Sequence, residues 1–358
     1  MINAARRSFT SLPPVREPVC ILKHANGSVP PRTESVSCEP QNRVFVVQEF
    51  LGIPLCVMAG VCCGSGENGR RAAEIVSDTF PPAVDRLVNA RLRAQLMTLS
   101  GAPSVDRTAV DEMLQDMNVV FDLALSKIHV QMISTGSEFD HSGVTMACVV
   151  VVSNVAFVVN VGDNCVFLVR RSRVVRRLKL LPASPIVLSA PPRHVSTTET
   201  RFSGYHLARV HTPESPRERD RLKRAGATES TVQGDTGTGR ARLHVGLASD
   251  PDRAAAFSRC LGHRALGAIG VKCECSCAFK LMVEGKHVAA VIGTSSVFEA
   301  LSDTDIVSLA TDGTPQDAVK AIIETASARH GRSNAAECTA LLIHFHPHLW
   351  QRSLVSSR

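Results

Sequence analysis

Cysteine and histidine are the residues of this chain whose chemistry is easiest to identify. The sequence has 12 cysteines and 13 histidines, and both side chains can bind zinc. The thiols closest together in the sequence are Cys62 and Cys63, and then Cys273, Cys275 and Cys277. They form no Cys-x-x-Cys pair with matching histidines, and the second group alternates as in a strand with thiols on one face. We interpret them as buried free thiols, and a zinc site is the alternative.

Cys63 could instead be a nucleophile, because a glycine-rich segment follows it at 64–69. A cysteine-based phosphatase also needs an arginine placed to hold the phosphate beside the nucleophile. Arg70 lies seven residues after Cys63, which is out of register for a Cys-x5-Arg loop. We therefore favour an ordinary thiol at this position.

Composition and charge indicate a globular protein. Hydrophobic residues make up 44% of the 358 residues and charged residues 20%. The apolar run 144–152 is too short to cross a membrane and predicts a buried strand. The net charge of +7 is dispersed, with its densest basic run at 170–179. Because Tyr205 and Trp350 are the only Tyr and Trp, little surface exists for stacking bases. We expect a solvated hairpin there, and nucleic acid is not an expected partner.

The cysteines also bear on the compartment. No secretory signal peptide accompanies them, which favours a reducing, intracellular location, cytoplasmic or mitochondrial. Residues 1–16 carry Arg6, Arg7 and Arg16 and no acidic residue. That pattern is compatible with a mitochondrial presequence and equally with a disordered tail.

Hydrophobic periodicity places the elements that would position these residues. It predicts strands at 43–48 and 54–61, a helix from Gly69 that Pro81-Pro82 interrupts, and a further helix over 83–97. A long amphipathic helix is predicted over 107–133, followed by strands at 144–152, 155–161 and 165–170. Residues 182–200 are expected to be a polar connection, 214–225 a short helix, and 234–239 a loop. A strand at 287–292, helices near 302–310 and 314–330, and a strand at 340–345 complete the pattern.

This order favours an α+β fold with largely antiparallel sheets, layered α/β/β/α, because short turns join the central strands. We expect one domain over residues 20–346, a flexible tail at 1–19 and another at 347–358.

Several segments resemble, in order, the signature blocks of the metal-dependent (type 2C) serine/threonine phosphatases. The blocks are 60–66 (GVCCGSG), 142–145 (SGVT), 160–164 (NVGDN), 207–213 (LARVHTP), 218–226 (ERDRLKRAG), 264–272 (RALGAIGVK), 292–302 (IGTSSVFEALS) and 336–339 (AECT). The resemblance implies a central β-sandwich flanked by pairs of helices. It also implies hydrolysis of phosphoserine and phosphothreonine at a two-metal centre of Mn²⁺ or Mg²⁺, which needs several carboxylate ligands.

Most of those carboxylates are replaced in this sequence. The positions where the family has a metal-binding aspartate or glutamate are Ser35, Cys63, Ala268, Ser295 and Ala336. Gly64, next to Cys63, keeps the family's glycine. Asp163 and Glu34 are the residual metal-ligand candidates, and Arg32 is the nearest, out-of-register candidate for the family's phosphate-binding arginine.

The expected function follows from that loss. One or two carboxylates cannot offset the charge of two hard dications, and a cysteine is a soft ligand. We expect a catalytically inactive pseudophosphatase without cofactor, acting as a protein-interaction or structural subunit of a larger assembly. The alternative is a weakly active phosphatase with a rearranged Mn or Mg site, drawing on Asp163, Glu34, His211, Asp140 or His141.

Overall fold

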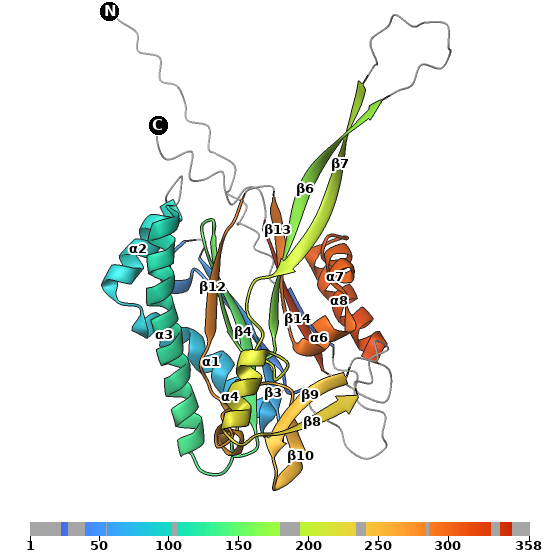
Figure 1. Cartoon of the computed structure of the whole chain (residues 1–358). Helices are drawn as coiled ribbons and strands as arrows, with labels where there is room; N and C mark the ends of the chain where they lie inside the picture. Colours follow the sequence, from blue (N-terminus) through green and yellow to red (C-terminus); the bar gives the residue numbers. More distant parts are fainter. Residues whose placement is uncertain are drawn as a thin grey trace, which may run out of the picture.

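Two antiparallel sheets pack face to face at the centre of the molecule (Figure 1). The computed structural model describes residues 23–27, 40–54, 56–101, 106–179, 194–233, 241–283, 286–330 and 337–345. In order across the first sheet lie β12 (Ser276–Leu281), β5 (Val155–Val161), β4 (Gly143–Val152), β3 (Val57–Ser65) and β2 (Arg43–Gln48), with β11 (Leu261–Gly262) paired to β4. Across the second lie β1 (Lys23–Gly27), β14 (Cys338–His344), β13 (His287–Gly293), β6 (Cys165–Lys179) and β7 (His194–His206). A 3₁₀ turn, η1 (Phe50–Gly52), follows β2.

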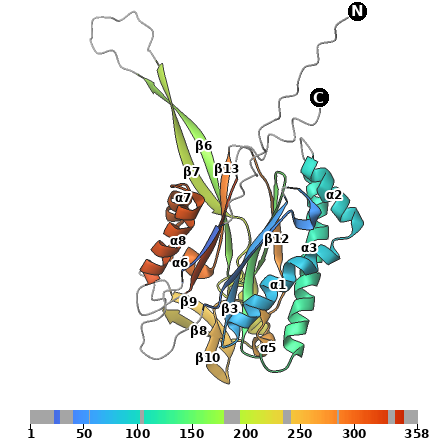
Figure 2. The ribbon, with the colours of Figure 1, turned by 180° about the vertical axis from the view of Figure 1, so that it is seen from behind.

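Helices cover the outer face of each sheet. The first sheet carries α1 (Gly69–Leu87), α2 (Ala90–Gly101) and α3 (Arg107–Ser134), and Figure 2 shows α1 against β3. The second carries α6 (Ser295–Ala300), α7 (Asp303–Ala310) and α8 (Pro315–His330). The predicted α/β/β/α layering is therefore confirmed.

The position of β4 between the second sheet and the helices explains its continuous apolar sequence. Ala147, Val149 and Val151 pack between the two sheets, while Met146 and Cys148 face the helices. A strand covered on both faces has no solvated side and therefore lacks the alternation of an exposed strand. The same logic accounts for the long helix, since the apolar stripe predicted for 107–133 is the buried side of α3.

The cysteines behave as small apolar side chains. Cys62 and Cys148 lie in the core between the first sheet and its helices, and Cys338 lies in the core under α8. All three are fully buried and free. The prediction of a buried free thiol is confirmed for Cys62 and Cys275, whereas Cys63, Cys273 and Cys277 are free but only half-buried.

The predicted break at Pro81-Pro82 is wrong. α1 continues through both prolines to Leu87, and the chain turns instead near Asn89, whose side-chain oxygen accepts from the amide of Leu92. A proline in a helix interior costs about 3 kcal/mol through a lost hydrogen bond and a steric clash. Burial of Phe80, Pro81 and Val84 against the sheet offsets that cost.

The predicted connection at 182–200 is also wrong in its second half. Residues 194–200 belong to β7, which pairs with β6 from Phe167↔His206 out to Lys179↔His194. Hydrophobic periodicity does not predict this strand, because the residues concerned are polar. They form a strand because their backbone pairs in register with β6. Figure 1 shows the two strands continuing past the rest of the second sheet as a projecting ribbon.

A third, small sheet lies at the end of the sandwich opposite the ribbon (Figures 1 and 2). It consists of β10 (Asp250–Ala255), β9 (Ala241–Leu247) and β8 (Thr228–Gln233), accompanied by α4 (Pro216–Arg224) and α5 (Arg264–Gly267). Leu222, Val245, Phe257 and Leu266 form its core. Within the described ranges, no helix combines the length and hydrophobicity needed to cross a membrane. The predicted tails at 1–19 and 347–358 lie outside those ranges.

Candidate functional site

A cavity of about 620 Å³ opens where β3, β4 and β5 end at the same edge of the first sheet. Cys63 and Thr145 face each other in register across β3 and β4, and Asp163 follows β5 directly. All three line the cavity, together with Ser65, His141 and His263. The structure thus brings together Cys63 and Asp163, two of the residues singled out in the sequence.

Two glycines allow the backbone to form this edge. A Cβ at Gly64 would lie 2.3 Å from the carbonyl oxygen of Gly69, so β3 can approach the start of α1 only without a side chain there. Gly162 has a φ of +103°, and its Cβ would meet the side chain of Thr145. The turn at Gly162 directs Asp163 into the cavity.

The carboxylate of Asp163 is already neutralised by an arginine. Asp163 is 7% exposed, and its Oδ2 accepts from Nη2 of Arg242 at 3.3 Å. Nη1 of the same guanidinium lies 2.7 Å from Oε1 of Glu299, on α6. Arg242 comes from β9, so the third sheet places a cation between a carboxylate that follows β5 and one on α6. Burial raises the pKa of Glu299, Arg242 opposes that rise, and Asp163 adds to it.

Cys63 is a protonated thiol. Burial raises its pKa well above the usual value, and the negative charges of Asp163 and Glu337 raise it further. A thiol of this kind supplies neither a thiolate nucleophile nor an anionic metal ligand near neutral pH. Glu337, in turn, is engaged by the backbone, since its carboxylate accepts from the amides of Gln41 at 2.7 Å and Asn42 at 3.0 Å.

Of the other replaced positions, the structure describes Ala268 and Ser295, and neither lines the cavity. Ala268 is exposed at the C-cap of α5, and Ser295 is half-buried at the start of α6. Arg32, Glu34, Ser35 and Ala336 lie outside the described residues. Asp140, a candidate for a rearranged site, is paired with Arg264 at 2.7 Å.

Three residues of the site were missed in the sequence. Arg242 and Glu299 carry no local signal, because their encounter depends on how the third sheet packs. His263 has one, since it stands directly before the Arg-Ala-Leu-Gly block. Its Nε2 lies 2.7 Å from Oγ of Ser65, and burial, followed by His141, lowers its pKa to about 4.

His211 supports the site from behind. The amide of Gly162 donates to its Nδ1 at 3.2 Å, and Nε2 faces the hydroxyl of Ser276. Nδ1 is therefore an acceptor, and the imidazole is neutral. Burial, and after it the charge of Arg259, lower its pKa to about 3. His211 thus fixes the Gly162 turn and is not among the cavity-lining residues.

Acid should weaken the fold through His211. Its pKa is about 3 in the native state and about 6.5 when unfolded. The unfolded chain therefore binds the extra proton first, and stability present above pH 6.5 is lost as the pH falls toward 3. At pH 5 the loss from this residue is about 2 kcal/mol. Urea unfolding at pH 7.5 and 5.0 should show a shallower pH dependence for His211→Gln than for the wild type, and equal slopes would contradict this assignment.

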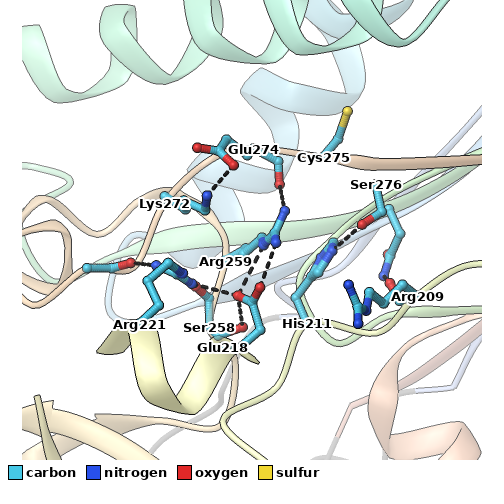
Figure 3. Close-up of polar contacts among 12 residues, drawn as sticks. Arg209, His211, Glu218, Arg221, Ser258, Arg259, Lys272, Glu274, Cys275 and Ser276 are labelled. Atoms are coloured by element: carbon cyan, nitrogen blue, oxygen red, sulfur yellow. Dashed lines mark hydrogen bonds and ion pairs between the residues drawn. The ribbon is translucent and has the colours of Figure 1, made fainter. Parts of the chain in front are cut away.

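Behind the cavity, Glu218 of α4 binds two arginines in a buried cluster (Figure 3). Its Oε1 pairs with Nη2 of Arg259 at 2.6 Å, and its Oε2 with Nη2 of Arg221 at 2.6 Å. The hydroxyl of Ser258 donates to Oε2 at 2.8 Å. Burial alone would raise the pKa of Glu218, but these contacts outweigh it and hold the pKa far below its usual range. Glu218 therefore holds α4 against the segment that joins β10 to β11.

The residues present do not fit a dinuclear metal centre. Nowhere in the described part of the chain do three or more His, Cys, Asp or Glu side chains gather as a metal site would require. Cys275 and Cys277, whose sulfurs are 3.7 Å apart, pack against the apolar core. Paired Mn²⁺ or Mg²⁺ ions need several anionic oxygen ligands, whereas Asp163 is bound to Arg242 and Cys63 is protonated.

Comparisons with known proteins agree with the fold. The family model described as "Protein phosphatase 2C" matches residues 104–335. A serine-threonine phosphatase 2C from Toxoplasma gondii superposes with a TM-score of 0.63 at 17% identity, covering 91% of this chain and 94% of that one. A C. elegans sex determining protein gives a TM-score of 0.57 at 13% identity, covering 92% of this chain and 66% of that one. No curated protein matches the sequence.

Proposed function

The chain belongs to the protein phosphatase 2C family, and we propose that it is a member that does not hydrolyse phosphoesters and acts instead as a protein-binding or structural subunit. The fold is retained in full while the chemical groups of the site are replaced. A domain of this kind can present the family's surfaces and loops to a partner without turning over a substrate.

The observation that carries this proposal is the position of Arg242. Its guanidinium lies between Asp163 and Glu299, where its positive charge offsets part of the negative charge that could otherwise bind a dication. A metal ion at Asp163 would have to displace this arginine or bear its repulsion at close range. Arginine is always charged, so no ordinary pH change removes the competitor.

A weakly active enzyme is the second candidate. Asp163 and His141 line the same cavity, and they could contribute ligands to one Mn²⁺ or Mg²⁺ ion if Arg242 moved away. A single ion would supply charge stabilisation to a bound phosphoryl group.

Turnover of para-nitrophenyl phosphate and of a phosphothreonine peptide separates the two candidates. We expect purified protein in millimolar Mn²⁺ or Mg²⁺ to show no metal-dependent hydrolysis above that of Asp163→Ala, because the donor set does not support the metal centre. Asp163→Ala serves as the control for contaminating phosphatases. Clear turnover that this substitution abolishes would overturn the proposal.

The proposal that the protein is a subunit of an assembly is tested by the size at which the native protein migrates. We expect the protein in extracts of its own cells to migrate as an assembly well above the 38.4 kDa of the chain. A homogeneous monomer would count against a subunit role.

A further inference from the structure

Ser65 and His263 form a hydrogen-bonded pair in the wall of the cavity. Nε2 of His263 lies 2.7 Å from Oγ of Ser65, and both residues line the cavity. Ser65 is the last residue of β3, and His263 directly follows β11, so the fold brings together residues that are 198 positions apart. A serine hydroxyl within hydrogen-bond reach of an imidazole is the arrangement in which serine acts as a nucleophile and histidine as its base.

The backbone around His263 is shaped to hold its ring at this position. His263 has a φ of 46° and a ψ of 54°, a left-handed conformation that is uncommon outside glycine. Its amide donates to the carbonyl oxygen of Ser142 at 2.8 Å. A Cβ at Gly143 would lie 2.6 Å from Cδ2 of His263, so the ring fits there because residue 143 is glycine. Strained residues of this kind concentrate at functional sites, where the surrounding structure fixes them.

The imidazole of His263 is neutral near neutral pH and can therefore accept a proton. Its ring is 8% exposed and packs on Phe257, with 5.4 Å between the ring centroids. Burial, followed by the charge of His141, lowers the pKa of His263 to about 4. A base with so low a pKa is always available but is weaker than one whose pKa is near 7, so the reaction that it assists should be slow.

The lining of the cavity favours an uncharged ligand over an anionic one. The volume of about 620 Å³ is in the range of small-molecule sites. One wall is apolar, formed by the alanines at 254–256 and Phe257. The described lining residues include Glu67, Glu138 and Asp163 but no lysine or arginine. This balance disfavours a phosphate ester and suits a small acyl group.

The beginning of α1 lies at the same cavity. Gly66, Glu67 and Asn68 line it, and Asn68 is the N-cap of this 19-residue helix. The positive end of the helix dipole favours negative charge that develops nearby. An oxyanion formed when the Ser65 hydroxyl attacks a carbonyl would carry such a charge.

We propose that Ser65 is a nucleophile that cleaves small carboxylic esters, with His263 as its general base. Oγ of Ser65 attacks the carbonyl carbon while Nε2 of His263 takes its proton. The ester C–O bond then breaks, the alcohol leaves with that proton, and the acyl group stays on Ser65. A water molecule, deprotonated by His263, next attacks the acyl carbon, which releases the carboxylic acid and returns the proton to Oγ. The reaction uses no metal ion, so it goes beyond the function proposed above and does not depend on it.

Labelling with an alkyl fluorophosphonate, which phosphonylates nucleophilic serines with loss of fluoride, tests the nucleophile. Mass spectrometry of peptides from the full chain locates the label. Ser137 is an internal reference, since it lines the same cavity and is exposed. We expect Ser65 to be labelled about 100-fold faster than Ser137, and His263→Asn to remove that difference. Asparagine tolerates the left-handed conformation, which keeps the backbone of the variant intact.

Turnover of para-nitrophenyl acetate in EDTA tests the complete reaction. The wild type should hydrolyse it without a metal ion, Ser65→Ala and His263→Asn should lose that activity, and Ser134→Ala, at an exposed serine of α3, should keep it. If His263→Asn does not fold, His263→Gln gives the same comparison. Labelling of Ser65 no faster than that of Ser137, or equal turnover in wild type and Ser65→Ala, would overturn the proposal. Because phosphoester turnover is measured in Mn²⁺ or Mg²⁺ and acetate turnover in EDTA, either proposal can fail without the other.

Discussion

Glu218→Ala is expected to lower the free energy of unfolding by about 3–5 kcal/mol, because it leaves two arginines partly buried without their shared carboxylate. The side chain of Glu218 is 5% exposed, that of Arg259 12% and that of Arg221 23%. Water therefore cannot easily replace the lost contacts. The substitution also removes the contacts of α4 with Ser258 and Arg259, in the segment that joins β10 of the third sheet to β11.

Urea unfolding of Glu218→Ala and of Glu229→Ala measures this effect against a matched control. Glu229 also pairs with an arginine of α4, Arg219, at 2.6 Å, but that pair is more exposed, so Glu229→Ala should be much less destabilising. If Glu218→Ala does not fold, Glu218→Gln keeps the shape of the side chain and should still be clearly less stable than wild type. Equal effects at Glu218 and Glu229 would show that the buried cluster does not anchor the fold.

Arg242→Met should convert the cavity into a cation-binding site. The substitution leaves Asp163 and Glu299 facing each other without a positive charge between them. The variant should be less stable than wild type in the absence of metal, and Mn²⁺ at about fifty times its dissociation constant should restore about 2 kcal/mol. Wild type should show no comparable response, because its guanidinium already occupies the position.

Thermal melts with and without millimolar Mn²⁺ test this expectation. Arg242→Lys keeps a positive charge and should remain insensitive to Mn²⁺, while Arg242→Met/Asp163→Asn removes a ligand and should lose the response. An equal Mn²⁺ shift in wild type, or none in Arg242→Met, would contradict the role given to Arg242.

Local periodicity was enough to predict most of the scaffold. The apolar stripe of α3 arises because one side of that helix is buried. The continuous apolar run of β4 arises because both faces of that strand are buried. β7 could not be predicted in this way, because its polar residues 194–200 become a strand only through their register with β6. The turn in the first helical region was misplaced because proline geometry is compatible with a helix wherever packing offsets the missing hydrogen bond.

The site could be predicted in part. Cys63 lies near the end of β3 and Asp163 follows β5, and both residues line the cavity because the two strands end at the same edge of the sheet. Arg242 and Glu299 could not be predicted, since they come from segments 57 residues apart and meet only once the third sheet has docked. The sequence can show that metal-binding carboxylates have been lost. Which group takes their place depends on tertiary packing.

The buried cysteines can report when the layers of the sandwich separate, because their thiols become accessible only then. Cys148 is sealed between the first sheet and α1–α3, and Cys338 between the second sheet and α8. Burial raises the pKa of both thiols, so neither reacts with an alkylating reagent until its layer separates. The labelling rate of each, read by mass spectrometry on native protein, therefore gives the opening free energy of one half of the sandwich independently of the other.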